Sequence, residues 1–313
     1  MRIHAVLGPF LETVREAITE AVETAARVQP APVACARACG NLPDPAPMTT
    51  HGALRTRRFA GVSLFPAAPS PLHVYQGGLG NCGFVATLAS FAATPDGRAR
   101  LRSLITETAP GCYVVHLHQR GADGVLRAVD VRVDDDVYVD AAGHPVYAAA
   151  SEGYWVSLIE KAAAQMRGGY DSLAGIGLED TFTMLLGDGR YSLIETSDSA
   201  VTNATEARDR TARIESLVRS ARTRGAPVIL ATHETDMARI AGRGLYPDHA
   251  YAVIDLERRN GETYLRVLEP NHRLEPGVNP ADSTAAASDG TLDGAFWVPA
   301  ARLGAFYWIC SPR

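Results

Sequence analysis

Residues 76–92 read QGGLGNCGFVATLASFA, and in this stretch a glycine-rich turn is followed by an apolar helix with Cys82 at its start. The first amides of a helix have no partner inside the helix, and the macrodipole makes this end positive. Both effects favour the thiolate, which is the reactive form of cysteine. Asn81 is a residue type that caps helices. The stretch predicts a nucleophile at Cys82, although on its own it is equally typical of a buried structural cysteine.

The residues before Cys82 favour the catalytic interpretation. Gly77, Gly78 and Gly80 carry no side chain that would hold a substrate backbone away, so they are candidate substrate-binding positions. Gln76 lies six residues before the cysteine, and its side-chain amide can donate a hydrogen bond to an oxyanion formed there. We therefore expect Gln76 to belong to the catalytic machinery.

The composition excludes several classes of partner. A chain of 313 residues can bury a large core in two compact units. It is 46% hydrophobic and 21% charged with a net charge of −5, which gives no reason to expect nucleic acid or a membrane surface as a partner. Apolar runs as long as a transmembrane helix are absent from the sequence, and the N-terminus lacks the pattern of a signal peptide.

Cysteine and lysine usage bear on where the protein works. Five cysteines at irregular spacing do not predict a disulfide framework, and their odd number favours a reducing compartment. Lys161 is the only lysine among 30 basic residues. GC-rich coding and selection against ubiquitin acceptor sites in a protein delivered into eukaryotic cells both explain this bias, and both indicate a bacterial source. We expect a cytoplasmic protein, or one exported without a signal peptide by a dedicated secretion system.

The chain divides into three parts, residues 1–60, 61–200 and 201–313. The first part holds an amphipathic helix over 9–28 and a proline-rich strap over 29–53 that is typical of a linker. This helix is expected to pack on the catalytic body; the alternative is that it docks a host-protein target or a chaperone. The second part is rich in helices and carries Cys82, and the third is rich in strands.

Periodicity predicts the main elements of these parts. Asn260-Gly261 is a strong hairpin signal, and residues 95–97 (Pro-Asp-Gly) predict an interruption after the first helix. The expected helices are 82–93, 153–167 and 209–223, and the expected strands are 112–119, 125–133, 228–231, 250–256 and 264–268.

Five segments resemble, in the same order, sequence blocks of the calpain family of papain-like cysteine peptidases. Residues 76–85 resemble its block Q-G-x-L-G-D-C-W-F-L, and residues 152–171 (EGYWVSLIEKAAAQMRGGYD) are similar to its helix E-x-x-W-x-x-L-L-E-K-A-Y. Residues 242–254 (GRGLYPDHAYAVI) are similar to its histidine block G-L-x-x-G-H-A-Y-S-V. Residues 264–270 (YLRVLEP) stand in the place of its asparagine block R-N-P-W-G, and residues 294–310 resemble its closing segment G-E-F-W-M-S-F.

The resemblance implies an α+β fold of two lobes, a papain-like calpain core with a helical cysteine lobe and an antiparallel β-rich histidine lobe. It implies that Cys82 is the nucleophile and His249 the general base. His233 also follows a strand and is the alternative base. The third catalytic member stays open, because Glu269 stands where the family has asparagine and Asn271 follows two residues later. Asn271 is also a candidate for substrate binding.

Two positions depart from the family pattern. Gly83 replaces the tryptophan beside the nucleophile, and Asn271 occupies the position of the tryptophan that follows the Asn-Pro pair. In animal members calcium bound to each lobe aligns the lobes and moves this second tryptophan out of the cleft. We therefore expect a more open cleft and no calcium switch.

Other candidate metal ligands lack the partners that a metal site needs. Zinc sites combine three or four ligands, and EF-hands need a defined spacing of acids. The candidates that fall short are the pairs His116/His118 and Cys35/Cys39 and the acidic run 134–136. We expect neither a metal nor another cofactor.

The sequence thus predicts a calpain-like cysteine endopeptidase that hydrolyses peptide bonds through a thioester at Cys82, acts on a protein or peptide, and serves as a bacterial effector or toxin domain. Two alternatives remain. One is a Cys-His acyl-transfer or deamidase toxin domain on the same fold. The other is a catalytically silent binding module.

Overall fold

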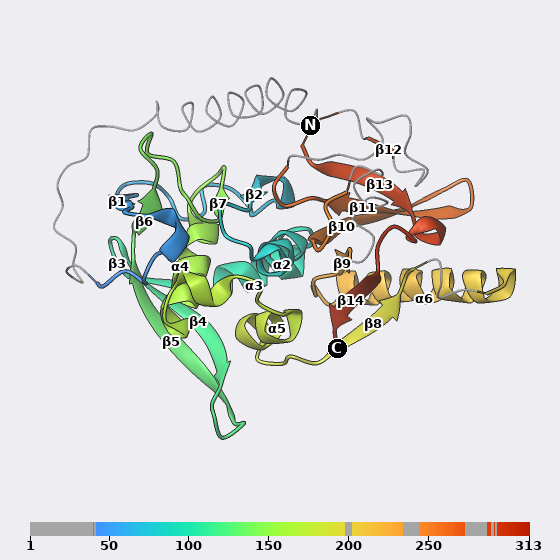
Figure 1. The fold of residues 1–313 in the computed structure, drawn as a ribbon, viewed down its shortest axis with the longest axis horizontal. Coiled ribbons are helices and arrows are strands. Elements are labelled where there is room, and N and C mark those ends of the chain that lie inside the picture. Colours follow the sequence, from blue (N-terminus) through green and yellow to red (C-terminus); the bar gives the residue numbers. More distant parts are fainter. Residues whose placement is uncertain are drawn as a thin grey trace.

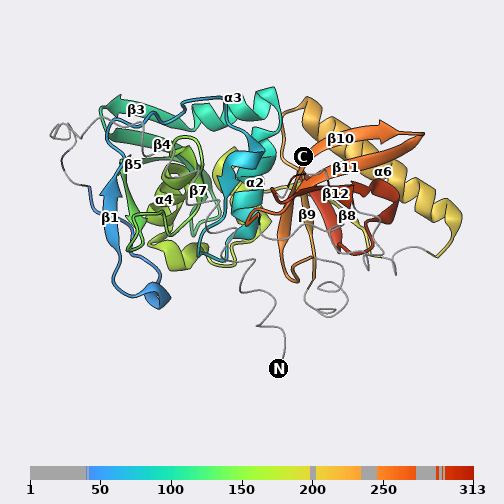
Figure 2. The ribbon, with the colours of Figure 1, turned by 90° about the horizontal axis from the view of Figure 1, so that it is seen from above.

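The computed structural model describes residues 40, 42–197, 202–233, 245–272, 287–288, 291 and 293–313. These residues form two lobes that lie side by side, with helix α2 (Cys82–Ala92) between them (Figures 1 and 2). Helices and antiparallel sheets occur together, so the predicted α+β class is confirmed. The helix predicted over 9–28 lies outside the described residues.

The first lobe surrounds α2 with helices and small sheets. α2 is buried from Gly83 to Ala92, as its continuously apolar sequence predicts. Strands β3, β4 and β5 form one antiparallel sheet, while β1 pairs with β6 and β2 with β7. The elements are β1 (Arg55–Arg58), β2 (Val74–Tyr75), α3 (Pro95–Ser103), β3 (Ile105–Ala109), β4 (Cys112–Arg120), β5 (Leu126–Asp134), β6 (Asp136–Val139), β7 (Ala149–Ala150), α4 (Trp155–Arg167) and α5 (Leu178–Leu186), with 3-10 turns at Thr49–His51, Pro71–His73 and Tyr170–Leu173.

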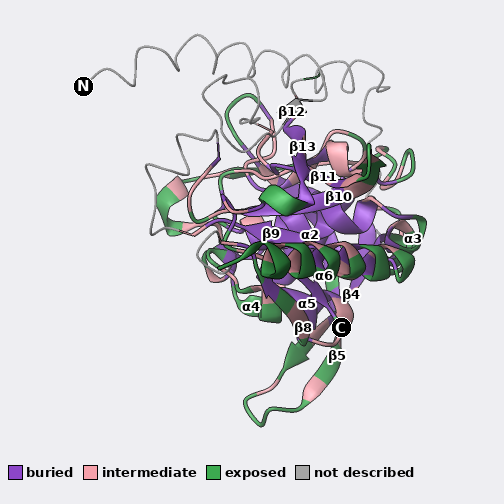
Figure 3. Cartoon of the chain, turned by 90° about the vertical axis from the view of Figure 1, so that its right-hand side faces the viewer, coloured by how far each residue is buried: buried purple, intermediate pink, exposed green. Residues whose placement is uncertain are grey.

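The second lobe is a seven-stranded antiparallel sheet in the order β12-β13-β11-β10-β9-β14-β8. Helix α6 (Ala204–Thr223) packs on it through Ile214, Val218 and Ala221, and its other side is exposed (Figure 3). Asn260 and Gly261 have positive φ angles of 50° and 85° and join β10 to β11, which confirms the predicted hairpin. The strands are β8 (Tyr191–Glu195), β9 (Ile229–Ala231), β10 (Ala250–Arg259), β11 (Glu262–Leu268), β12 (Ala287–Ser288), β13 (Ala295–Pro299) and β14 (Trp308–Pro312), with a 3-10 turn at Ala300–Arg302.

The interruption predicted at residues 95–97 is also the start of a helix. α2 ends at Ala92, and Pro95 is already the first residue of α3. Thr94 is the N-cap of α3, and its hydroxyl accepts the N–H of Gly97 at 3.1 Å. Proline is favoured at this position because it needs no hydrogen-bond partner for an N–H. The residues that end one helix therefore begin the next.

The sheet of the second lobe begins before the boundary predicted at residue 200. β8 precedes that boundary, yet it pairs antiparallel with β14 at the C-terminal end of the chain, for example Leu193 opposite Cys310. A strand of five residues whose partner is distant in sequence gives no local sign of that partner.

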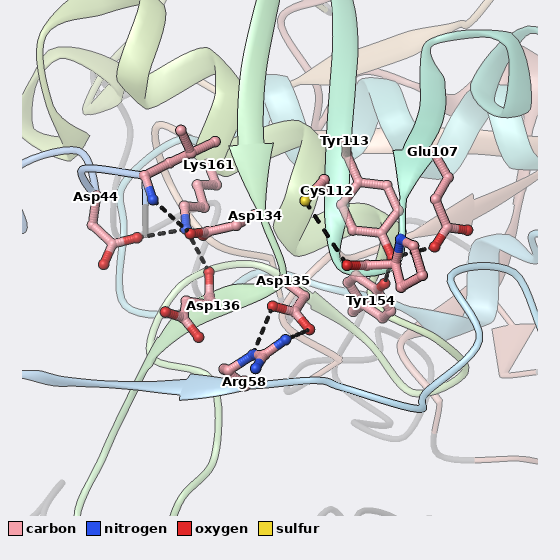
Figure 4. A network of polar contacts seen from close by, with 12 residues as sticks. Asp44, Arg58, Glu107, Cys112, Tyr113, Asp134, Asp135, Asp136, Tyr154 and Lys161 are labelled. Atoms are coloured by element: carbon pink, nitrogen blue, oxygen red, sulfur yellow. Dashed lines mark hydrogen bonds and ion pairs between the residues drawn. The ribbon is translucent and has the colours of Figure 1, made fainter. Parts of the chain in front are cut away.

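The described part of the proline-rich strap packs on the first lobe rather than forming a free linker. Lys161 of α4 lies 2.5 Å from Asp44 Oδ1 and 2.7 Å from Asp134 Oδ1, and its side chain is only 2% exposed (Figure 4). Tyr138 donates its hydroxyl proton to the carbonyl of Pro45 at 3.1 Å. The strap is therefore held by a buried ion-pair cluster that loses a partner if either side is removed.

The cysteines differ in state. Cys82 is free and half-buried, Cys310 is free and buried, and Cys112 is disulfide-bonded. The structure thus records a disulfide at Cys112, where the cysteine spacing predicted no disulfide framework. Cysteine spacing does not reveal such a pairing.

Hydrogen bonds tie the two lobes together beside α2. The N–H of Gln76 donates to the carbonyl of Pro270 at 2.8 Å. The His272 Nε2–H donates to the carbonyl of Val74, also at 2.8 Å. Ser90 of α2 donates its hydroxyl proton to a carbonyl of β10 at 2.9 Å. The nucleophile helix is therefore anchored in both lobes.

Candidate active site

Cys82 is the first residue of α2, where the sequence placed it. Asn81 holds the N-cap position, but its side chain makes no capping hydrogen bond; its Nδ2–H donates to Glu160 Oε1 at 2.7 Å. The predicted capping role of the Asn81 side chain is therefore wrong. The N–H of Gly83, in the first turn of α2, lowers the pKa of the Cys82 thiol. First-turn amides can do this because they have no partner inside the helix.

His249 directly precedes strand β10 and faces Cys82 across the lobes. The backbone N–H of His249 donates to Thr232 Oγ1 at 3.0 Å. This hydrogen bond fixes the backbone where the strand begins. Its ring makes edge contacts with Tyr246 and Tyr251, with centroids 5.4 and 5.1 Å away. The imidazole lies next to the sulfur of Cys82, so that each group shifts the pKa of the other. The structure thus brings the predicted nucleophile and the predicted base into contact.

Glu269 follows strand β11 and is fully buried. Its Oε1 lies 2.9 Å from His249 Nε2. Asn271 donates to the same oxygen from its backbone N–H at 2.7 Å and from Nδ2 at 3.0 Å. Of the two residues that the sequence left open, Glu269 is therefore the one in contact with the imidazole, and Asn271 holds the carboxylate in place.

Electrostatics favour a thiolate–imidazolium pair. Burial alone would raise the pKa of Cys82, but hydrogen bonds from His249, Ala250 and Gly83 and the charge of the imidazolium lower it below its ordinary value. Burial alone would lower the pKa of His249, but its contacts with Cys82 and Glu269 raise it to about 9. Each partner stabilises the charged form of the other, so the ion pair is favoured at neutral pH.

His233, the alternative base, lies in a different environment from His249. It follows strand β9, and its ring lies against Tyr307 with centroids 4.7 Å apart. The histidine that contacts the thiol is His249, so the match to the family block was a better guide than position after a strand.

The side-chain amide of Gln76 makes one hydrogen bond within the protein and keeps a further donor. Its Nε2 donates one proton to the carbonyl of Leu79 at 2.7 Å, while its Oε1 is buried without a partner in the described part of the chain. The Leu79 contact fixes the orientation of the amide group. A second Nε2 proton stays available for an acceptor in the cleft.

A cavity of about 380 Å³ lies beside Gln76. Four predicted site residues, Gln76, Gly77, Gly78 and Asn271, line it. Asn271 connects the cavity to the catalytic group, because it also contacts Glu269. Three of the four predicted substrate-binding positions thus line one cavity; Gly80 and Cys82 are not among its described lining residues.

The glycines before Cys82 differ in why their positions carry no side chain. A Cβ atom at Gly77 would lie 2.4 Å from the backbone of Val146 and Tyr147, so glycine is required there by the packing of the chain on itself. Gly78 donates its N–H to the Val146 carbonyl at 2.7 Å. The space around Gly80 is open. Close approach of protein backbone therefore explains Gly77 without a substrate.

Sequence reasoning missed Glu160, which lies in α4 behind the nucleophile. It is fully buried and receives hydrogen bonds from Asn81 and from the N–H of Ala148, at 2.7 and 2.8 Å. Burial raises its pKa to about 7, against the lowering effect of these two hydrogen bonds. Glu160 lies within the continuously buried run 155–164, and a charged residue in such a run indicates a special role.

No group of three or more His, Cys, Asp or Glu side chains is placed to hold a metal ion in the described part of the chain. Near the strap, Asp171 accepts the N–H of Thr49, and His73 lies 3.6 Å from Glu152. Calcium needs six to eight oxygen ligands. His116 is held by Asp130 and does not join a cluster.

Helices long and apolar enough to cross a membrane are absent from the described residues.

Comparisons with known proteins agree with this geometry. The family described as "Calpain family cysteine protease" matches residues 54–275. "Calpain-type cysteine protease DEK1" of Arabidopsis thaliana is 23% identical over 250 residues, which cover 78% of this chain and 11% of that protein. "Calpain-7" of Sus scrofa is 31% identical over 218 residues, which cover 64% of this chain and 25% of that protein. The chain thus spans a quarter or less of the length of these relatives.

The matched range contains Cys82, His249 and Glu269, and the two lobes that carry them meet as the resemblance implied. This chain belongs to the calpain family of cysteine proteases.

Proposed function

We propose that this chain is a cysteine endopeptidase. The thiolate of Cys82 attacks a peptide carbonyl carbon and forms a tetrahedral intermediate. Its oxyanion is stabilised by the N–H of Cys82 and by the free Nε2 proton of Gln76. His249, as imidazolium, gives its proton to the leaving amine, and the C–N bond breaks to leave a thioester on Cys82.

Water then hydrolyses the thioester. Neutral His249 accepts a proton from the attacking water, the C–S bond breaks, and the thiolate–imidazolium pair is restored. Glu269 stabilises the imidazolium in both steps, and Asn271 orients the Glu269 carboxylate. In this proposal Glu269 does the work that an asparagine does in the family pattern.

The observation that carries the proposal is the unbroken line of contacts from Cys82 through His249 to Glu269. The Cys82 sulfur and the His249 imidazole shift each other's pKa, and a 2.9 Å contact joins the imidazole to the Glu269 carboxylate. A buried carboxylate behind a histidine stabilises the imidazolium and fixes the tautomer. A binding module has no use for such an arrangement.

The test combines covalent labelling with product analysis. A thiol-reactive peptide epoxide should add its mass to Cys82 at neutral pH, and a denatured proteome incubated with the protein should gain new N-termini. Cys82→Ala should abolish both signals. Cys310→Ala, which removes the buried free thiol, should leave both unchanged.

The outcomes separate the alternatives. Absence of labelling at Cys82 would refute the catalytic proposal and favour a silent binding module. Labelling of Cys82 with release of ammonia and no new N-termini would replace the endopeptidase by a deamidase. The bacterial effector or toxin role stays a prediction, and secretion of the tagged protein from its native host would test it.

A further inference from the structure

A second hollow lies on the β-rich lobe, between helix α6, the edge strand β8 and the end of β14. It has a volume of about 470 Å³, and none of its described lining residues belongs to the cavity lined by Gln76 and Asn271. Figure 3 shows α6 in front, with β8 below it and the C-terminal residue at its side. We call this hollow the α6–β8 groove.

Three arginines give the groove its charge. Arg213 and Arg224 come from α6 and the turn after it, and Arg313 follows β14. Among the described lining residues there is no Asp or Glu side chain, and serine hydroxyls from both α6 and the strands supply further donors. The side chains of the lining are therefore positive, on a chain with a net charge of −5.

These arginines have no carboxylate partner in the described part of the chain. Arg224 donates only to backbone carbonyls, those of Ser220 at 3.3 Å and Pro312 at 3.1 Å. Neighbouring arginines are paired; on the same helix Arg219 lies 2.8 Å from Glu215. The groove therefore gathers guanidinium groups that remain free to take a carboxylate in bidentate fashion.

The groove also has a strand edge. β8 is the terminal strand of the seven-stranded sheet and pairs with β14 on one side. In the described residues its other edge carries no strand, and the Leu193 side chain is 46% exposed. An unpaired edge offers backbone N–H and C=O groups to an extended peptide, which joins the sheet as an extra strand.

We propose that the α6–β8 groove binds an acidic polypeptide segment in extended conformation. Its backbone pairs with the outer edge of β8, its carboxylates contact Arg213, Arg224 and Arg313, and an apolar side chain between them covers Leu193. Charge complementarity selects the occupant, because a basic or neutral strand would leave the three guanidinium groups without an anion. Binding at this groove does not depend on catalysis at Cys82.

The test uses a fluorescein-labelled peptide of four Glu-Val repeats and the full chain carrying Cys82→Ala, so that the probe cannot be cleaved. Fluorescence anisotropy should show saturable binding that weakens as salt is raised. Arg213→Glu combined with Arg224→Glu should weaken binding at least tenfold. Arg208→Glu, an exposed position of the same helix outside the groove, should change it less than twofold. Melting curves confirm that all variants are folded.

Two matched probes complete the experiment. A Gln-Val peptide should not bind, since it has no charge. A Glu-Val peptide N-methylated at every residue keeps its charge but has no backbone N–H to pair with β8, and it should bind at least tenfold more weakly. Equal binding of the methylated and unmethylated peptides would overturn the strand-pairing part of the proposal. Equal loss in the Arg208 control, or the absence of saturable binding of the Glu-Val peptide, would overturn the acidic-segment proposal.

Discussion

Replacing Glu269 by glutamine should shift the alkaline limit of activity to lower pH. Glutamine keeps an oxygen that can accept the three hydrogen bonds now made to Glu269 Oε1, from His249 and from the two N–H groups of Asn271. The substitution therefore removes the negative charge while retaining the shape. Its effect reports how far this charge stabilises the imidazolium.

The magnitude follows from the pKa of His249. An increase from 6.5 to about 9 corresponds to roughly 3 kcal/mol in favour of the imidazolium. The contacts with Cys82 and with Glu269 share this stabilisation, and the Cys82 hydrogen bond is the larger of the two. Assigning somewhat less than half of it to Glu269 gives about 1.4 kcal/mol, which is a tenfold change in the ionisation constant. The pKa of His249 should fall by about one.

The sign of the rate effect is fixed by the proton that the leaving amine needs. Above the pKa of His249 the imidazolium is lost and the rate falls, so a lower pKa brings this fall to lower pH. With the limit moved from about pH 9 to about pH 8, the variant should lose roughly fivefold in kcat/KM at pH 9 and little at pH 6.5.

The assay is the pH profile of kcat/KM on a peptide from the proteome digest, with the imidazole of His249 followed by NMR. Glu257→Gln serves as the matched control, because Glu257 is an exposed acid of β10 that pairs with Arg259. Its profile should coincide with that of the unmodified protein. An unshifted alkaline limit in Glu269→Gln, or an equal loss of rate at every pH, would refute the proposed electrostatic role of Glu269.

Four further outcomes are expected. Gln76→Ala should lower kcat by about 10²–10³, and a change in KM alone would assign Gln76 to structure. The stability of the protein should fall as pH rises from about 4.5 to 7, because burial raises the pKa of Glu160 and its charged form is disfavoured in the folded state; denaturant titrations of Glu160→Gln should lack this fall. A thiol probe should react with Cys82 equally fast in excess chelator and in millimolar calcium, and a tenfold acceleration by calcium would contradict this. Deleting residues 1–39 should leave labelling of Cys82 intact, whereas deleting 1–53 should lower the melting temperature, since it removes Asp44 from the buried lysine cluster.

Much of the catalytic group could be predicted because its signals are local. The nucleophile follows a glycine-rich turn at the start of an apolar run, and the structure begins α2 at Cys82. The turn at Asn260-Gly261 fixes the pairing of β10 with β11. This pairing places His249, before one strand, and Glu269, after the other, at the same end of the hairpin.

Other features depend on directions and distances that the sequence does not carry. Glu269 and Asn271 are two residues apart, so only the side-chain geometry shows which of them meets the imidazole. Asn81 is a residue type that caps helices, but its side-chain amide donates instead to the buried carboxylate of Glu160 in α4. The partner of β8 is the last strand of the chain, beyond the reach of any local pattern. By contrast, Thr94 and Pro95 carried a helix-start signal that was treated only as an interruption.

The contacts between the lobes affect which amino-acid substitutions this protein can accept during evolution. The bond from Gln76 to Pro270 joins two main-chain groups, and the bond to Val74 reaches a main-chain carbonyl. Main-chain donors and acceptors persist when side chains are exchanged, except where proline removes an N–H. The Gln76–Pro270 bond can therefore outlast extensive substitution around the cleft, whereas the bonds donated by His272 and Ser90 depend on those side chains. Such a scaffold leaves evolution free to reshape the surfaces that choose a substrate while the spacing of nucleophile and base is inherited unchanged.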